Sequence, residues 1–80
     1  MNLDAALMEI RFEYQKARER FPPFHTAHEG YAVLLEEVDE LWDEVKRQYS
    51  GERDKAIHKE ALQVAAMALA MMLECSRGDP

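Results

Sequence analysis

Apolar and small residues recur at steps of four and three from residue 3 to residue 21, which is the spacing of one helical face. The pattern predicts a helix over residues 3–20. Pro22 and Pro23 end it, because proline donates no hydrogen bond to the helix ladder and disfavours helical angles in the residue before it. Phe21 and Phe24 are expected to cover the end of a helical bundle. The members of the seam are Leu3, Leu7, Ile10, Tyr14, Ala17 and Phe21.

A second helix is predicted from Thr26 to the pair Ser50 and Gly51. Thr26 and Glu29 have the spacing of a capping box, in which each side chain accepts a hydrogen bond from the other residue's amide. A serine and a glycine at the far end are expected to close the helix. Its apolar residues fall within an arc of roughly 120° and are expected to form the core. They are Tyr31, Leu34, Leu35, Val38, Leu41, Trp42, Val45 and Tyr49.

A third helix is predicted from about residues 53–55 to about Cys75, with a stop signal at residues 77–80. Every residue from 64 to 73 is apolar, so this stretch has no polar face and must be covered on nearly all sides. Two helices of the same chain are too few for that. We therefore expect a second copy of the chain to cover it, with the small side chains permitting close approach. These are Ala65, Ala66, Ala68 and Ala70.

The predicted fold class is all-α: one domain, residues 1–80, whose three helices form an antiparallel helical bundle completed by oligomerisation to a dimer or tetramer. Eighty residues bury a small core, and outside support is usual at this size. The single cysteine, Cys75, has no partner for an internal disulfide. Without a signal peptide or an apolar run near 18 residues, the chain is expected to be cytoplasmic and not membrane-bound.

Charge changes this picture in one segment. The net charge of −6 argues against binding a nucleic-acid polymer. Between residues 29 and 44 there are seven acids and no Lys or Arg, and six like-charge pairs at helical spacing cost on the order of 2 kcal/mol in total. A solvated acidic face is one explanation. A divalent cation that offsets the repulsion is the other, and carboxylates are the ligands that Mg²⁺ or Mn²⁺ prefers.

A second acidic position favours the cation. Glu60 lies in line with Val64, Met67 and Met71 at the head of the apolar stripe of the third helix. Burying a carboxylate there is expensive unless it is paired or binds a metal ion. Gln63, one turn further on, offers an amide oxygen to the same site.

The segment Leu35–Leu41 reads LEEVDEL, which matches the EExxE motif of the MazG-like, all-α nucleoside triphosphate pyrophosphohydrolases. Glu60–Gln63 reads EALQ and stands where that family has ExxD. Nineteen residues separate the two motifs, which suits two antiparallel helices joined by a short loop. The chain resembles this family over about residues 26–75.

The resemblance implies an Mg²⁺-dependent enzyme that cleaves a nucleoside triphosphate to the monophosphate and pyrophosphate and works as a dimer or tetramer. It places Glu36, Glu37, Glu40 and Glu60 at the metal ions, and the first three at the catalytic centre. Gln63 supplies a neutral amide where the family has Asp, which is expected to lower the affinity for metal.

The residues that would bind the nucleotide are less clearly indicated by the sequence. Lys46 and Lys59 flank the turn between the second and third helices, where they either attract phosphates or are solvated surface residues. Trp42 either stacks on a base or belongs to the core. His25, His28, His58 and Cys75 lack the partners of a transition-metal or nucleophile site and are interpreted as structural.

An alternative from another class stays open. A non-catalytic helical oligomerisation or adaptor module would show the same acidic face and bind a basic partner through it. Titration with Mg²⁺ or Mn²⁺ and release of pyrophosphate from a panel of nucleotides would separate the two alternatives.

Overall fold

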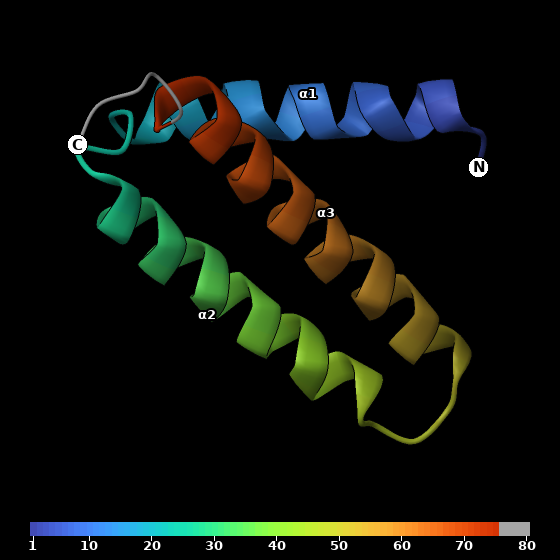
Figure 1. Ribbon diagram of the computed structural model, residues 1–80. Coiled ribbons are helices and arrows are strands. Elements are labelled where there is room, and N and C mark those ends of the chain that lie inside the picture. Colours follow the sequence, from blue (N-terminus) through green and yellow to red (C-terminus); the bar gives the residue numbers. More distant parts are fainter. Residues whose placement is uncertain (76–80) are drawn as a thin grey trace.

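The computed structural model describes residues 1–75 and consists of three helices (Figure 1). They are α1 (Leu3–Arg20), α2 (Ala27–Val45) and α3 (Gly51–Glu74). Helix accounts for 81% of the described residues, and none of residues 1–75 is in a strand. The predicted all-α class is confirmed, and so are the bounds of the first helix. The stop signal predicted at residues 77–80 lies outside the described part of the chain.

Each helix begins at a side-chain cap. Asn2 Oδ1 accepts a hydrogen bond from the Ala5 amide, and Thr26 Oγ1 accepts one from the Glu29 amide. The Thr26 cap was predicted, but the return contact differs, because the Glu29 carboxylate contacts the amide and ring of His25 instead. These caps satisfy amides that have no partner within the first turn of a helix.

The junction between α2 and α3 corrects the prediction that Ser50 and Gly51 close the second helix. Ser50 instead caps α3, where its Oγ accepts from the Arg53 amide at 3.0 Å, and Gly51 is the first residue of that helix. Helix α2 ends at Val45, whose carbonyl accepts from the Arg53 guanidinium at 2.7 and 3.2 Å. A cation and donor from the next helix therefore closes α2 in place of a glycine.

Helix α3 is the central element of the fold. It forms an antiparallel pair with α2, and α1 crosses obliquely at the end of that pair where α2 begins and α3 ends (Figure 1). Within residues 1–75, α1 and α2 each contact α3 but not one another. Ala66, Met67 and Ala70 on α3 are buried. The middle of α3, expected to need a second copy, is thus partly covered within one chain.

Close packing of α2 on α3 depends on Gly30, the buried residue of α2. A Cβ atom at this position would lie 3.0 Å from Cδ2 of Phe24, 3.1 Å from Cγ of Met71 and 3.4 Å from Sγ of Cys75. The first turn of α2 therefore touches the last turns of α3 because residue 30 has no side chain. Cys75 is half-buried at this contact, as expected for a structural cysteine.

At the same end of the molecule, the buried carboxylate of Glu74 connects α1, the loop after α1 and the end of α3. Glu74, whose side chain is 7% exposed, accepts from the Tyr14 hydroxyl at 2.8 Å and from the Phe24 amide at 2.9 Å. The Arg18 guanidinium forms an ion pair with it at 3.2 Å and also donates to the carbonyls of Phe21 and Pro22. Burial and the Glu74 carboxylate raise the pKa of Tyr14. This network holds α1 and the loop after it against the end of α3.

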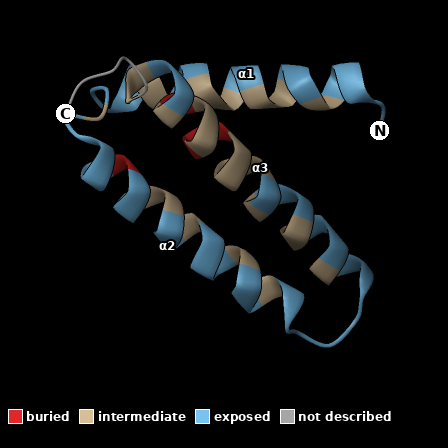
Figure 2. Ribbon diagram, viewed as in Figure 1, coloured by how far each residue is buried: buried red, intermediate tan, exposed pale blue. Residues whose placement is uncertain are grey.

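The predicted core of α2 is wrong for most of its members. Leu34 and Leu41 are half-buried, whereas Tyr31, Leu35 and the other four apolar residues are exposed (Figure 2). The side of α2 that meets α3 is rotated from the apolar arc and includes a glycine and carboxylates. In the seam of the first helix only the three middle members, Ile10, Tyr14 and Ala17, are half-buried. The exposed members are Leu3, Leu7 and Phe21 on or after α1, and Tyr31, Leu35, Val38, Trp42, Val45 and Tyr49 on or after α2.

Helix α3 is also long enough, and apolar enough on average, to cross a membrane. The core helix of a soluble protein has the same length and composition, and α3 contains the three buried apolar residues of the described chain. The expectation of a cytoplasmic protein stays a prediction.

Candidate metal centre

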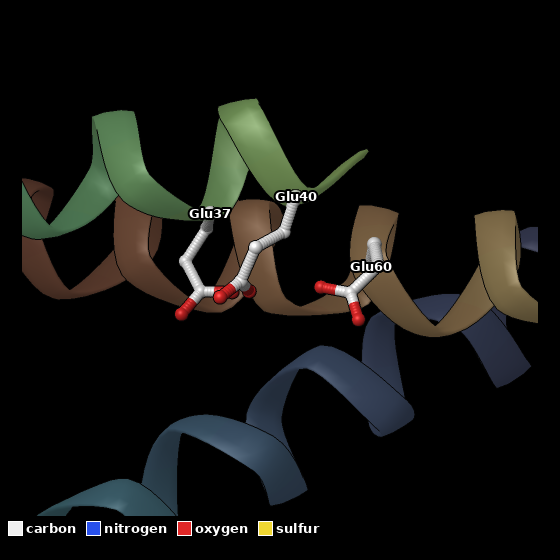
Figure 3. A group of neighbouring side chains, drawn as sticks. All are labelled: Glu37, Glu40 and Glu60. Atoms are coloured by element: carbon white, nitrogen blue, oxygen red, sulfur yellow. The ribbon is translucent and has the colours of Figure 1, made fainter. Parts of the chain in front are cut away.

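Three carboxylates from two helices converge on the side of α2 that faces α3. Glu37 and Glu40 lie one turn apart on α2, and Glu60 lies opposite them on α3 (Figure 3). One carboxylate oxygen of each residue lies within 4.8 Å of one oxygen of each of the others. Oxygens at such separations can contact one cation, because metal to oxygen distances in proteins are about 2.0–2.6 Å.

The helical register explains this convergence. Residues three apart share one side of a helix, so Glu37 and Glu40 project together. Glu60 is seven residues before the buried Met67 and therefore lies on the packed side of α3. The antiparallel pairing of α2 with α3 then sets the two motifs side by side, as the spacing between them predicted.

Electrostatic repulsion and burial both raise the pKa values of these groups. The pKa of Glu37 is raised to about 7, first by burial, then by a hydrogen bond with the Glu40 side chain and by repulsion from neighbouring carboxylates. The pKa of Glu60 is also raised, first by burial and then by Glu40, while Lys59 lowers it. The metal-free cluster therefore holds a proton near neutral pH that a cation would displace.

Two oxygens in the cluster have no compensation from the protein. Within residues 1–75, Oε2 of Glu37 and Oε2 of Glu60 are buried and have no hydrogen-bond partner. A buried polar atom without a partner costs roughly 1–3 kcal/mol, and more when it is charged. Both oxygens are hard ligands, so a divalent cation would satisfy them. The donor set fits Mg²⁺ or Mn²⁺.

The other predicted ligands lie around this group. Glu36 is exposed and lies outside the three converging carboxylates, although its charge contributes to the raised pKa of Glu37. Gln63 is half-buried and lines a cavity together with Glu37. The structure also adds Glu44, which lies near enough to raise the pKa of Glu60. Its place four residues after Glu40 is the signal that could have marked it.

A cavity of about 440 Å³ opens between α1 and α2, with α3 below it. Its size lies in the range of small-molecule sites. Glu37 and Gln63 line it on the side of the three converging carboxylates, and basic residues of α1 line it on the other side. The basic side of this cavity was not predicted from the sequence, because nothing along the chain showed that α1 faces α2 across a gap. The basic residues are Lys16, Arg18 and Arg20, and the aromatic ones are Phe21 and Phe24.

The residues predicted to bind substrate are not among the described residues that line this cavity. Lys46 pairs with Asp43 at 3.1 Å, and the indole of Trp42 is 59% exposed on the outer side of α2. Lys59 is exposed beside Glu60. His58 contacts Glu9 of α1 at 2.8 Å.

Comparisons of the chain with known protein families, with curated proteins and with solved structures each found no match. The features of the chain that bear on its function are the geometry of the carboxylate cluster, the two buried oxygens that have no partner within residues 1–75, and the adjoining cavity.

Proposed function

We propose that the chain is a nucleoside triphosphate pyrophosphohydrolase of the MazG-like kind, dependent on Mg²⁺ or Mn²⁺. The observation that carries the proposal is the convergence of Glu37, Glu40 and Glu60, with two buried oxygens that no donor among residues 1–75 satisfies. A site kept only for solubility would leave its carboxylates in water, where such a cost does not arise.

Each residue then has a definite task. Glu37, Glu40 and Glu60 hold the cation, while Glu36 and Gln63 complete its surroundings directly or through water. When bound, the cation neutralises phosphate charge and lowers the pKa of a water molecule. A carboxylate of the cluster would accept the proton of the attacking water.

The cavity supplies a place for the substrate. A triphosphate that reaches from the carboxylate cluster toward α1 would meet Arg20 and would compete with Glu13 for Lys16, which lies 3.4 Å from that acid. Both cations would offset the phosphate charge that the acidic cluster repels. Arg18 is already engaged with Glu74 and orders the wall. Phe21 and Phe24 offer apolar surface for a base or sugar.

Release of pyrophosphate from a panel of nucleoside triphosphates, measured with Mg²⁺ and with Mn²⁺, tests the proposal. We expect turnover of at least one nucleotide, and we expect Glu40→Gln to reduce it by about 100-fold or more because a cation ligand is lost. Asp39→Asn is the matched control, since Asp39 is an exposed acid next in sequence and outside the cluster. Absence of turnover with every nucleotide, or equal loss in both variants, would reject the enzyme.

The alternative function is a non-catalytic helical adaptor with an acidic binding face. The exposed carboxylates of Glu36, Asp39 and Asp43 favour it, since they lie on α2 outside the converging group. Such a module would bind a basic peptide with an affinity that falls as salt is added. It would release no pyrophosphate, so the same assay separates the two functions.

A further inference from the structure

An unbroken apolar stripe lies on the outer side of α2, away from α3. Its five residues recur at steps of four, three, four and three, and each is between 36% and 59% exposed. Steps of four and three keep side chains on one line along a helix, which is the pattern of a helix that packs against a parallel or antiparallel neighbour. The stripe consists of Tyr31, Leu35, Val38, Trp42 and Val45.

No element of the same chain covers this stripe within the part that the structure describes. Helix α3 occupies the side of α2 that carries Gly30 and Glu37, and α1 does not contact α2. Leu34 and Leu41 lie between the two sides and are half-buried. The apolar surface is therefore continuous from the edge of the core to the outer stripe.

The size of the stripe distinguishes an interface from scattered surface residues. At these exposures the five side chains present on the order of 500 Å² of mostly apolar area, which is near the largest patch of a typical monomer. Two such stripes brought together would bury on the order of 1,000 Å² before any flanking residue is counted, which is the size needed for a specific interface.

We propose that the outer stripe of α2 is the contact between two copies of this chain. A two-fold contact pairs a surface with itself, and this stripe contains both large side chains, Tyr31 and Trp42, and small ones, Val38 and Val45, that can interdigitate. The buried apolar residues of one copy are only Ala66, Met67 and Ala70 within residues 1–75, so a second copy also enlarges a small core.

Charge favours a second copy of the chain over an anionic membrane or a nucleic acid as the partner of this stripe. Asp39 and Asp43 are exposed beside the stripe, and the chain has a net charge of −6. An anionic membrane or a nucleic acid is repelled by such a border. Two copies repel one another as well, so the self-association tightens as salt screens the acids, whereas binding of a basic partner weakens.

Trp42 is the sole tryptophan of the chain and lies in the stripe, so its emission reports on this contact alone. The experiment dilutes the full chain while sedimentation records its mass and fluorescence records Trp42. We expect a dimer at high concentration with blue-shifted emission, and a shift to the red on dilution at the same midpoint as the loss of mass. Added salt should move that midpoint to lower concentration.

Leu35→Glu tests the face, and Leu3→Glu is the matched control. Leu35 is 43% exposed on α2 and Leu3 is 71% exposed on α1, so neither change forces a charge into the core of one copy. We expect Leu35→Glu to raise the dissociation constant of the dimer by about 100-fold or more, because an unpaired charge enters the contact in both copies, and Leu3→Glu to leave it within about threefold. Circular dichroism confirms that the variants stay helical.

Three results would overturn the inference. One is a chain that remains a folded monomer with red emission at every concentration. The second is a dimer whose dissociation constant is unchanged in Leu35→Glu, or rises as much in Leu3→Glu. The third is Trp42 emission that shifts only with anionic vesicles or a basic peptide. If Leu35→Glu unfolds, the dilution of the unmodified chain still decides, because mass and Trp42 emission must change together.

Discussion

Two regions of the chain contain carboxylates with buried oxygens, and the regions differ in the partners that these oxygens have. At one end of α3, Glu74 accepts hydrogen bonds from the Tyr14 hydroxyl and the Phe24 amide and forms an ion pair with the Arg18 guanidinium. In the middle of the α2–α3 pair, Glu37 and Glu60 each keep a buried oxygen without a partner within residues 1–75. The same sequence therefore satisfies one buried acid fully and leaves others repelling one another.

This difference separates a structural role from a functional one. A buried charge with three partners contributes to stability and orders the segments that it joins. Partly buried acids that face one another reduce the stability of the fold, because burial and repulsion both disfavour their charged forms. Replacing an acid should consequently have opposite effects in the two regions, and this contrast can be tested.

The largest effect is expected at the satisfied carboxylate. Glu74→Ala should lower the free energy of unfolding by about 3 kcal/mol, because it leaves Arg18 and the Phe24 amide without their partner in a buried position. Urea unfolding followed by circular dichroism measures the change. Glu19→Gln, an exposed acid on α1, is the control and should change stability by less than about 0.5 kcal/mol. Equal effects of the two variants would contradict a structural role for Glu74.

In the cluster of Glu37, Glu40 and Glu60, neutralising an acid should change the free energy of unfolding in the opposite direction and by a smaller amount. The pKa of Glu37 is raised to about 7, above its ordinary value of 4.5, so the folded metal-free protein binds more protons than the unfolded chain between these values. Stability is then highest below the lower value and falls as pH rises toward the upper one. We expect a loss of about 1 kcal/mol over this range, since solvent screens a group that is only partly buried.

Glu37→Gln provides the test of that assignment. A neutral amide mimics the protonated acid, so the variant should lose most of the pH dependence and match or exceed the unmodified chain above neutral pH. Thermal unfolding without metal, recorded in a series of buffers, measures it. A pH dependence that survives the substitution unchanged would place its origin elsewhere in the molecule.

The smallest effect is expected at Gln63, where the amide stands beside the cluster and lines the cavity with Glu37. Gln63→Asp should tighten binding of Mg²⁺ or Mn²⁺ by about threefold, because a charged oxygen binds these cations better than an amide. Faster release of pyrophosphate should accompany it. Lower stability without tighter metal binding would favour the adaptor instead.

Local signals in the sequence predicted much of this molecule. The four-and-three spacing and the two prolines gave the bounds of α1, and Thr26 marked the start of α2. The two acidic motifs predicted one site of Glu36, Glu37, Glu40, Glu60 and Gln63, and the structure brings the carboxylates of Glu37, Glu40 and Glu60 together. Each of these signals depends on residues within one or two helical turns, or on the simple antiparallel pairing of two helices.

Features that depend on distant residues were not predictable in the same way. Arg53 closes α2 from the next helix, and Glu74 finds Tyr14 at a separation of 60 residues. The rotation of α2 also depends on what packs against it: close approach at Gly30 sets the inner side, and Leu35 and Trp42 are left outside. An apolar arc shows which residues avoid water but not whether its own chain or another one covers them.

Calorimetric titration of the metal-free chain with Mn²⁺ and Mg²⁺ tests the central claim, that Glu37, Glu40 and Glu60 form a cation site. We predict saturable binding with release of protons near neutral pH, and stabilisation by about 2.7 kcal/mol at a hundredfold excess over Kd. Binding should be lost in Glu40→Gln and kept in Asp39→Asn. No saturable heat with either cation, or binding that is equally strong in Glu40→Gln, would contradict the account.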